Sequence, residues 1–135
     1  MAEPTTVQAG IFRELHAGVI RVRDFYGMLQ WYTEVLELEP AKIMPDIQMA
    51  VLNLPGPSYL CLYKMGDDYA REDTPKCLMN WRTDDIEGTR NKLELHGVEC
   101  GQIMGSEHFK VFRFYDPEGT THDCCWFDEV YLPEK

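Results

Sequence analysis

The sequence predicts an α+β fold in which two βαβββ modules form a curved sheet around a shared cleft. Three observations support this prediction. A strand, a helix and three strands follow one another twice within 135 residues. Asp24 and Asp85 each precede a helical pattern and are candidate N-caps. In the second copy, the turn sequence Asp-Pro-Glu-Gly at residues 116–119 joins the last two predicted strands. Such an internal repeat indicates that neither copy closes a core alone.

These repeats define the predicted domain organisation. The length is that of one domain, 1–135. It would hold module one over about residues 12–65, a charged linker over about residues 66–76, and module two over about residues 77–128.

Module one begins with an apolar strand pattern over residues 15–22. From residue 25 the apolar period changes to 3.6, which predicts a helix that ends before Pro40, because a residue that precedes proline resists the α conformation. Its apolar stripe consists of Phe25, Met28, Leu29, Tyr32, Val35 and Leu36. Three extended stretches follow at residues 41–47, 48–54 and 58–65, the last two separated by a Pro-Gly-Pro turn.

Module two repeats this order. A strand over residues 77–83 precedes a helix over residues 86–96, which Gly97 ends as the residue after the cap. An extended stretch at residues 98–103 and a hairpin of residues 109–115 and 122–127 complete the module. In the hairpin turn, Pro117 presets φ and Gly119 permits a positive φ. Asp123 lies early on the second arm, where its carboxylate can point into whatever the sheet encloses.

Composition and charge exclude several classes of function. The net charge of −10 argues against a nucleic-acid backbone or an anionic membrane as partner. No apolar run approaches the roughly 18 residues of a membrane span, and no signal peptide is recognisable, so a cytoplasmic location is predicted. The five cysteines include no Cys-x-x-Cys pair, which indicates buried, reduced thiols and neither a disulfide framework nor a zinc ribbon.

Three motifs stand in order along the chain. They are Val-Arg-Asp-Phe at residues 22–25 with Trp-Tyr-Thr-Glu-Val-Leu at 31–36, Thr-Asp-Asp-Ile at 83–86 with Leu93 and Gly-Val at 97–98, and Phe-Tyr-Asp-Pro-Glu-Gly at 114–119. Together they resemble the motifs of the vicinal oxygen chelate superfamily, which includes glyoxalase I, bleomycin-resistance proteins and extradiol dioxygenases. The resemblance covers roughly residues 12–128. It implies the two-module fold, a small-molecule ligand, often a divalent metal, and a homodimer.

The metal positions of the superfamily are mostly not kept. The resemblance places the four ligands at Ala17, at Leu78, within residues 59–63, and at Asp123. Ala and Leu cannot coordinate a cation, and residues 59–63 contain no carboxylate. Asp123 alone keeps a ligand type, so no metal is favoured as cofactor.

An alternative register would keep a divalent metal. His16 lies one residue before its expected ligand position, and Cys77 shows the same offset in the second module. A β-bulge could turn His16 into the cleft, where His16 and Asp123 would be metal ligands. In a regular strand, His16 instead faces the helix or lies at an edge.

The regular register predicts an organic-ligand site. Its residues are Ala17, Val19, Arg21, Leu78, Asn80, Arg82 and Asp123. Two guanidinium groups, an amide and apolar patches suit a molecule that carries an acidic or carbonyl group, or an aromatic ring. The competing interpretation is that Arg21 and Arg82 are exposed or ion-paired, for example with Asp123. His108 is either an acid or base at the cleft mouth or an exposed loop residue.

Three functions follow from these alternatives. The first is a small-molecule-binding protein of the superfamily that lacks the usual metal site. The second is a metal-dependent lyase, isomerase or dioxygenase of the same superfamily. The third is a structural or regulatory protein with a vestigial cleft. The sequence assigns no catalytic residue and leaves open whether the protein is an enzyme.

Overall fold

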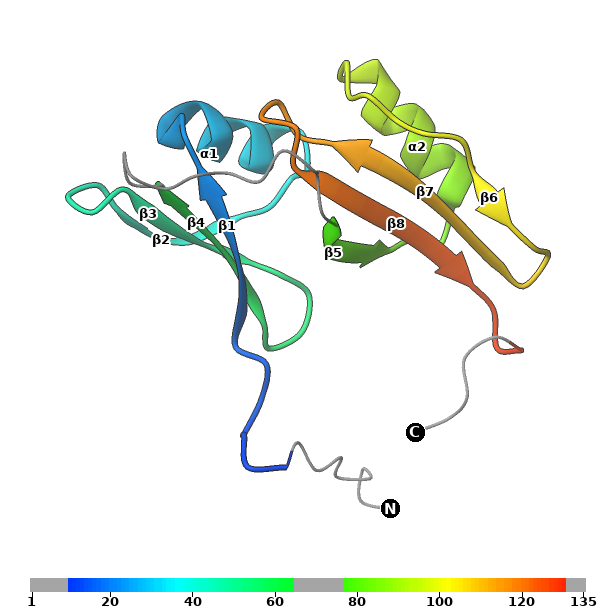
Figure 1. Cartoon of the computed structure of the whole chain (residues 1–135), viewed down its shortest axis with the longest axis horizontal. Helices are drawn as coiled ribbons and strands as arrows, with labels where there is room; N and C mark the ends of the chain where they lie inside the picture. The colour runs from blue at the N-terminus through cyan, green and yellow to red at the C-terminus, as the bar shows by residue number, and fades with distance from the viewer. Residues whose placement is uncertain (1–9, 65–76, 131–135) are drawn as a thin grey trace.

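The computed structural model describes residues 10–64 and 77–130 (Figure 1). Module one contains β1 (Ala17–Val22), α1 (Phe25–Glu34), β2 (Pro40–Met44), β3 (Met49–Asn53) and β4 (Tyr59–Lys64). Module two contains β5 (Cys77–Arg82), α2 (Ile86–Leu95), β6 (Met104–Gly105), β7 (Phe109–Tyr115) and β8 (Thr121–Phe127). The predicted α+β fold of two βαβββ modules is confirmed. The predicted linker over residues 66–76 lies outside the described residues.

Each module forms its own four-stranded sheet. The strand orders are β1-β4-β3-β2 and β5-β8-β7-β6, so the two sheets have the same topology. In both, the first strand pairs in parallel with the last, and the other pairs are antiparallel. Figure 1 shows α1 over the first sheet and α2 over the second, both on the upper side. The opposite face of each sheet is called the helix-free face below.

The first strand has the regular register. Ile20 and Val22 are fully buried with Phe25, Met28 and Tyr32 of α1. The pairing of β1 with β4 runs without interruption along β1, and the Tyr59 N–H donates to the His16 carbonyl 2.8 Å away, which extends the ladder by one residue. His16 itself precedes β1, so strand alternation does not fix the direction of its side chain. In β5, by contrast, the register shifts between Cys77 and Met79.

Both helices begin at the predicted caps. The Asp24 Oδ1 accepts the Gly27 N–H at 3.1 Å, and the Asp85 Oδ1 accepts the Gly88 N–H at 3.0 Å. α2 ends as predicted at Gly97, whose φ is 78°. The Val98 N–H donates to the Leu93 carbonyl and the Gly97 N–H to that of Glu94, which is the Schellman arrangement.

α1 ends before Pro40, as predicted, although Val35 and Leu36 of the predicted apolar stripe lie beyond its last residue. The helix stops at Glu34, well before Pro40. The cause lies beyond the last turn, because Glu37 adopts the left-handed conformation with a φ of 59° and redirects the backbone. Neither glycine nor asparagine marks this turn, so the sequence pattern did not indicate it.

The Asp-Pro-Glu-Gly turn is built as predicted and also joins the modules. Gly119 has a φ of 83°, and the Asp116 Oδ1 accepts the N–H groups of Glu118 and Thr120 at 2.9 and 2.8 Å. The Glu118 carboxylate reaches module one, where it accepts the N–H groups of Arg23 and Asp24, each at 2.8 Å. It thus lies at the N-terminus of α1, where the helix dipole favours an anion.

Removing this carboxylate should weaken the attachment of the two modules. We expect Glu118→Ala to lower the free energy of unfolding by about 1 kcal/mol, because the bonds that it breaks are solvent-exposed. Urea denaturation measures the change. Glu99→Ala, which removes an exposed carboxylate elsewhere in module two, is the matched control and should change stability by less than about 0.5 kcal/mol. Equal effects of the two variants would contradict the assigned role.

Two apolar clusters fill the space between the sheets and their helices. One lies under α1 and the other under α2, and Trp31, Leu36 and Trp81 pack against both. These shared side chains make the two cores continuous. Among the described residues, no helix has the length and apolar character needed to span a membrane.

Candidate functional site on the helix-free face

The helix-free face of β1 carries the predicted residues of module one. Val19 is 49% exposed and Arg21 is exposed, whereas their neighbours Ile20 and Val22 are buried on the other side. The Arg21 guanidinium carbon lies 4.8 Å from the centroid of the Tyr63 ring on β4. This geometry is that of a cation–π contact. Ala17, half-buried, occupies the start of the same face.

β5 and β8 carry the predicted residues of module two. Asn80 is the register partner of Asp123, and Arg82 is the partner of Cys125, so all four lie on the helix-free face. The Arg82 guanidinium carbon lies 4.2 Å from the centroid of the Phe127 ring. Both arginines of the predicted site thus stack on an aromatic ring. The side chain of Leu78, the remaining predicted residue, lies outside the described part of the structure.

Asp123 forms an ion pair with Arg113, which was not among its predicted partners. Its Oδ1 accepts from Arg113 Nε at 2.9 Å, and the side chain of Asp123 is 23% exposed. The hairpin register offered a signal, since pairing Tyr115 with Thr121 across the turn sets Arg113 opposite Asp123. The two charged groups, with Met104 and Val111, border a cavity of about 380 Å³.

The residues at the four metal positions do not fit a divalent cation. Ala17 has no donor atom, and Asp123 is already paired with Arg113. The helix-free side of β4 supplies Tyr59, Cys61 and Tyr63, none of which is a carboxylate. Among the residues that the structure describes, no three His, Cys, Asp or Glu side chains group closely enough to hold a metal ion. The exposed His16 ring lies 5.3 Å from that of Tyr59.

The thiols on this face are unsuited to nucleophilic chemistry. Cys61 and Cys125 are each only 5% exposed. Burial raises the pKa of both thiols, so they stay protonated near neutral pH, whereas the nucleophile is the thiolate. On the helix side of β8, burial raises the pKa of Cys124 to about 12.

A buried chain of hydrogen bonds runs beneath the site and joins the modules. Trp81 Nε1 donates to His122 Nδ1 at 3.1 Å, and because indole is only a donor, the imidazole proton must be on Nε2. Nε2 then donates to the Tyr32 hydroxyl at 2.8 Å, and the hydroxyl donates to Asp116 Oδ2 at 2.7 Å. Tyr32 comes from α1, whereas the other three residues belong to module two.

His122 is a structural residue in this arrangement. Its side chain is fully buried and stacks on Phe114, with ring centroids 5.0 Å apart. Burial lowers its pKa to about 4, while Asp116 and Asp123 act in the opposite direction. The imidazole is therefore neutral at physiological pH. Strand alternation separates His122 from its neighbour Asp123, which faces the other side of β8.

His108 lies at the far end of the hairpin from the Asp-Pro-Glu-Gly turn. Its Nδ1 is 2.7 Å from Asp128 Oδ2, and its Nε2 is 3.2 Å from Glu107 Oε1. The residue is half-exposed, just before β7. It is therefore held between two carboxylates next to the end of β8.

Comparison with known proteins identifies the family. The sequence profile of the Glyoxalase/Bleomycin resistance protein/Dioxygenase superfamily matches residues 14–122. The chain belongs to this superfamily. The family resemblance carried by the three sequence motifs is thereby confirmed. Among curated proteins, none matches the chain.

Several solved structures share the fold of this chain. TnmS3, an antibiotic binding protein from Streptomyces sp. CB03234, superposes with a TM-score of 0.74 at 16% identity, over 88% of this chain and 99% of its own. A glyoxalase family protein from Enterococcus faecalis gives a TM-score of 0.70 at 21% identity, with 86% and 99% covered. Lactoylglutathione lyase from Agrobacterium tumefaciens gives 0.68 at 14% identity, with 90% and 98% covered. At these identities the likeness concerns the fold.

Proposed function

We propose that this superfamily member binds a small organic molecule on its helix-free face, without a metal in the chelate positions. The observation that carries the proposal is the donor set on that face. Ala17 and Asp123 occupy two of the positions at which metal-using members need ligands. Ala17 has no donor atom, and the Asp123 carboxylate is paired with Arg113, whose Nε lies 2.9 Å from Oδ1. The ligand carries an acidic or carbonyl group, an aromatic ring, or both.

The two stacked arginines support this ligand class. A guanidinium that lies on an aromatic ring is held in one orientation, so less side-chain freedom is lost when its edge binds a carboxylate or carbonyl oxygen. Arg21 lies on Tyr63 and Arg82 on Phe127, and these rings also offer apolar surface. Asn80 adds an amide donor beside them. The combination resembles small-molecule sites in which few polar groups orient a mainly apolar ligand.

One structural neighbour has a function of this kind. TnmS3 is an antibiotic binding protein, and it covers 88% of this chain at a TM-score of 0.74. In that protein the same fold therefore serves the binding of a small molecule. A homodimer and a cytoplasmic location remain predictions from the resemblance and from composition.

Metal content and ligand-induced stabilisation test the proposal together. Protein purified without an affinity tag should contain well under one metal ion per chain by elemental mass spectrometry, and Ni²⁺, Zn²⁺, Fe²⁺ or Mn²⁺ should not raise its melting temperature. About one metal per chain, lost on His16→Ala, would overturn the proposal in favour of the metal-dependent lyase, isomerase or dioxygenase.

Aromatic carboxylates should instead stabilise the protein. A ligand present at about 100 times its Kd adds roughly 2.7 kcal/mol to the free energy of unfolding, which raises the melting temperature by several degrees. We expect Arg82→Ala to weaken the affinity for the best ligand of such a panel about tenfold, because it removes a charge-assisted hydrogen bond. Isothermal titration calorimetry measures the change.

Arg13→Ala is the matched control for this loss. The Arg13 side chain is 94% exposed and precedes β1, so its removal should leave the affinity unchanged. Equal losses in Arg13→Ala and Arg82→Ala would indicate general charge attraction rather than a site. Lack of stabilisation by every compound in a broad metabolite panel would favour the vestigial cleft.

A further inference from the structure

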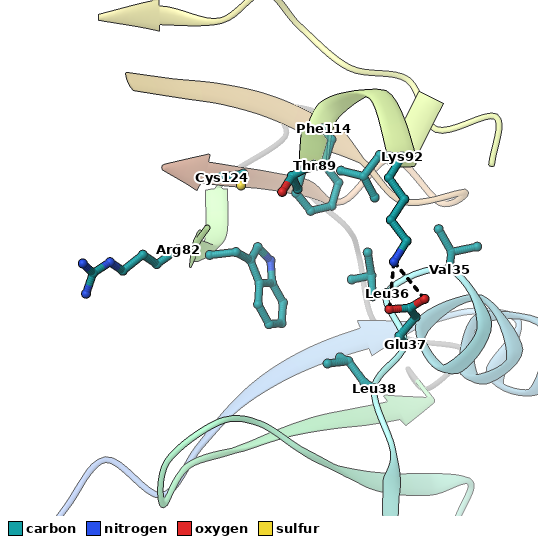
Figure 2. A pocket seen from close by; sticks show the side chains of 11 residues that line it. Val35, Leu36, Glu37, Leu38, Arg82, Thr89, Lys92, Phe114 and Cys124 are labelled. Atoms are coloured by element: carbon teal, nitrogen blue, oxygen red, sulfur yellow. Dashed lines mark hydrogen bonds and ion pairs between the residues drawn. The ribbon is translucent and has the colours of Figure 1, made fainter. Parts of the chain in front are cut away.

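A second pocket lies on the helix side of the sheets, between the modules (Figure 2). It has a volume of about 240 Å³. Module one contributes the segment that follows α1, including Leu36 and Leu38, and module two contributes α2 together with Trp81 and Phe114. Arg82 also lines the pocket, and it belongs to the ligand site proposed above as well.

The interior of this pocket is apolar. Leu36, Leu38, Leu93 and Phe114 line it, with the half-buried Trp81. Phe114 is 3% exposed and Leu93 is 7% exposed, so the wall that module two contributes is firmly packed. Figure 2 shows Arg82 directed away from the other labelled side chains.

The polar groups at the edge of the pocket already have partners. Lys92 of α2 pairs with Glu37, with the Nζ atom 3.0 Å from Oε1, and Figure 2 shows this pair bridging the two modules. The Thr89 hydroxyl is 2.6 Å from that of Thr83. An anionic ligand would therefore have to displace the Glu37 carboxylate from Lys92, whereas an uncharged ligand would leave the pair intact.

The position of Glu37 is itself unusual. Its φ of 59° is rare for a residue other than glycine and costs free energy. This conformation turns the backbone that follows α1 and places the Glu37 carboxylate at the edge of the pocket, opposite Lys92. Both side chains are well exposed, at 64% and 59%, so the pair is weak and readily opened.

We propose that this pocket binds a small uncharged apolar molecule, about the size of one aromatic ring with a short substituent. An engineered protein cavity of about 150 Å³ lined by Leu, Ile and Phe holds benzene, so a pocket of about 240 Å³ leaves room for a substituent. Trp81 and Phe114 provide aromatic walls, and the Glu37–Lys92 pair forms an openable edge. Arg82 is the lining residue that this pocket shares with the site on the helix-free face.

A fluorinated ring probe tests the proposal. Titration of the full chain with 4-fluorotoluene, followed by ¹⁹F NMR, should show saturable binding, and 4-fluorobenzoate should bind at least tenfold more weakly. Leu38→Trp should weaken the binding of 4-fluorotoluene at least tenfold, because the larger side chain fills the pocket. Lys92→Trp, at an exposed edge position that leaves the core intact, should weaken it at least threefold.

Two further variants distinguish binding in this pocket from binding elsewhere on the protein. Leu95→Trp introduces the same indole on α2 at a residue that is 88% exposed, and it should leave the affinity unchanged. Arg21→Ala alters the helix-free face and should also have no effect, so the failure of one site does not imply the failure of the other. Non-saturable binding, tighter binding of 4-fluorobenzoate, or unchanged affinity in both Leu38→Trp and Lys92→Trp would overturn the proposal.

Discussion

Replacing Tyr32 by Phe is expected to lower the free energy of unfolding by about 2 to 4 kcal/mol. The ring fits the same space, so the loss comes from the hydroxyl alone. That hydroxyl donates to Asp116 at 2.7 Å and accepts from His122 at 2.8 Å, and all three side chains are buried. Without it, an anionic carboxylate oxygen and an imidazole N–H lose a partner away from water, which costs more than the bond itself contributes. Urea denaturation measures the difference, and the melting temperature should fall by on the order of 10 °C.

Tyr26→Phe is the matched control for this prediction. Tyr26 lies on the same helix, but it is 57% exposed, so its hydroxyl can be replaced at a cost below about 0.5 kcal/mol. A Tyr32→Phe variant as stable as Tyr26→Phe would show that the chain of bonds contributes little to the attachment of α1 to module two. The double variant of Tyr32→Phe and His122→Phe would then measure the coupling free energy between these two side chains.

Local chemistry explains why most of the fold could be predicted. An aspartate before a 3.6 period, a glycine after one, and Asp-Pro-Glu-Gly between two apolar runs each act within a few residues. Accordingly, Asp24 and Asp85 cap their helices, and Gly97 and Gly119 take positive φ values of 78° and 83°. The alternation along β1 also indicated correctly that Ile20 and Val22 face the helix.

The interactions that organise the site could not be predicted in the same way, because they join distant parts of the chain. Tyr32 lies on the apolar stripe of α1, and nothing near it indicates that its hydroxyl meets Asp116, 84 residues further on. Asp116 was interpreted as a turn residue, yet its second oxygen is a buried acceptor. Arg113 is the exception, because the register of the predicted hairpin would have been enough to set it opposite Asp123. The second pocket depends on how α1 ends at Glu37, which has no sequence signature.

Acidification should destabilise the protein through His122, between pH 6.5 and about 4. The unfolded chain takes up a proton on this imidazole near the ordinary pKa of 6.5, whereas burial lowers the pKa in the folded protein to about 4. Within this interval the unfolded state binds more protons than the folded state, so the free energy of unfolding falls as the pH falls. The stabilising contribution of the neutral imidazole is fully present above pH 6.5. The contribution amounts to about 3 kcal/mol. The position of Trp81 also opposes protonation of His122 in the folded protein. Its indole N–H already points at Nδ1, the nitrogen that the second proton would occupy.

His122→Gln isolates this contribution from that of the carboxylates, which also titrate in acid. The glutamine amide does not titrate, so the variant should be less stable than the wild type at pH 7, and the gap should narrow by up to about 3 kcal/mol as the pH approaches 4. Urea denaturation at half-unit intervals of pH gives both curves. In the folded wild type, the His122 ring signals in NMR should remain those of the neutral Nε2–H tautomer down to about pH 5. A midpoint near pH 6.5 for those signals, or parallel stability curves, would show that the imidazole is not enclosed by Tyr32 and Trp81 in the way the bond distances require.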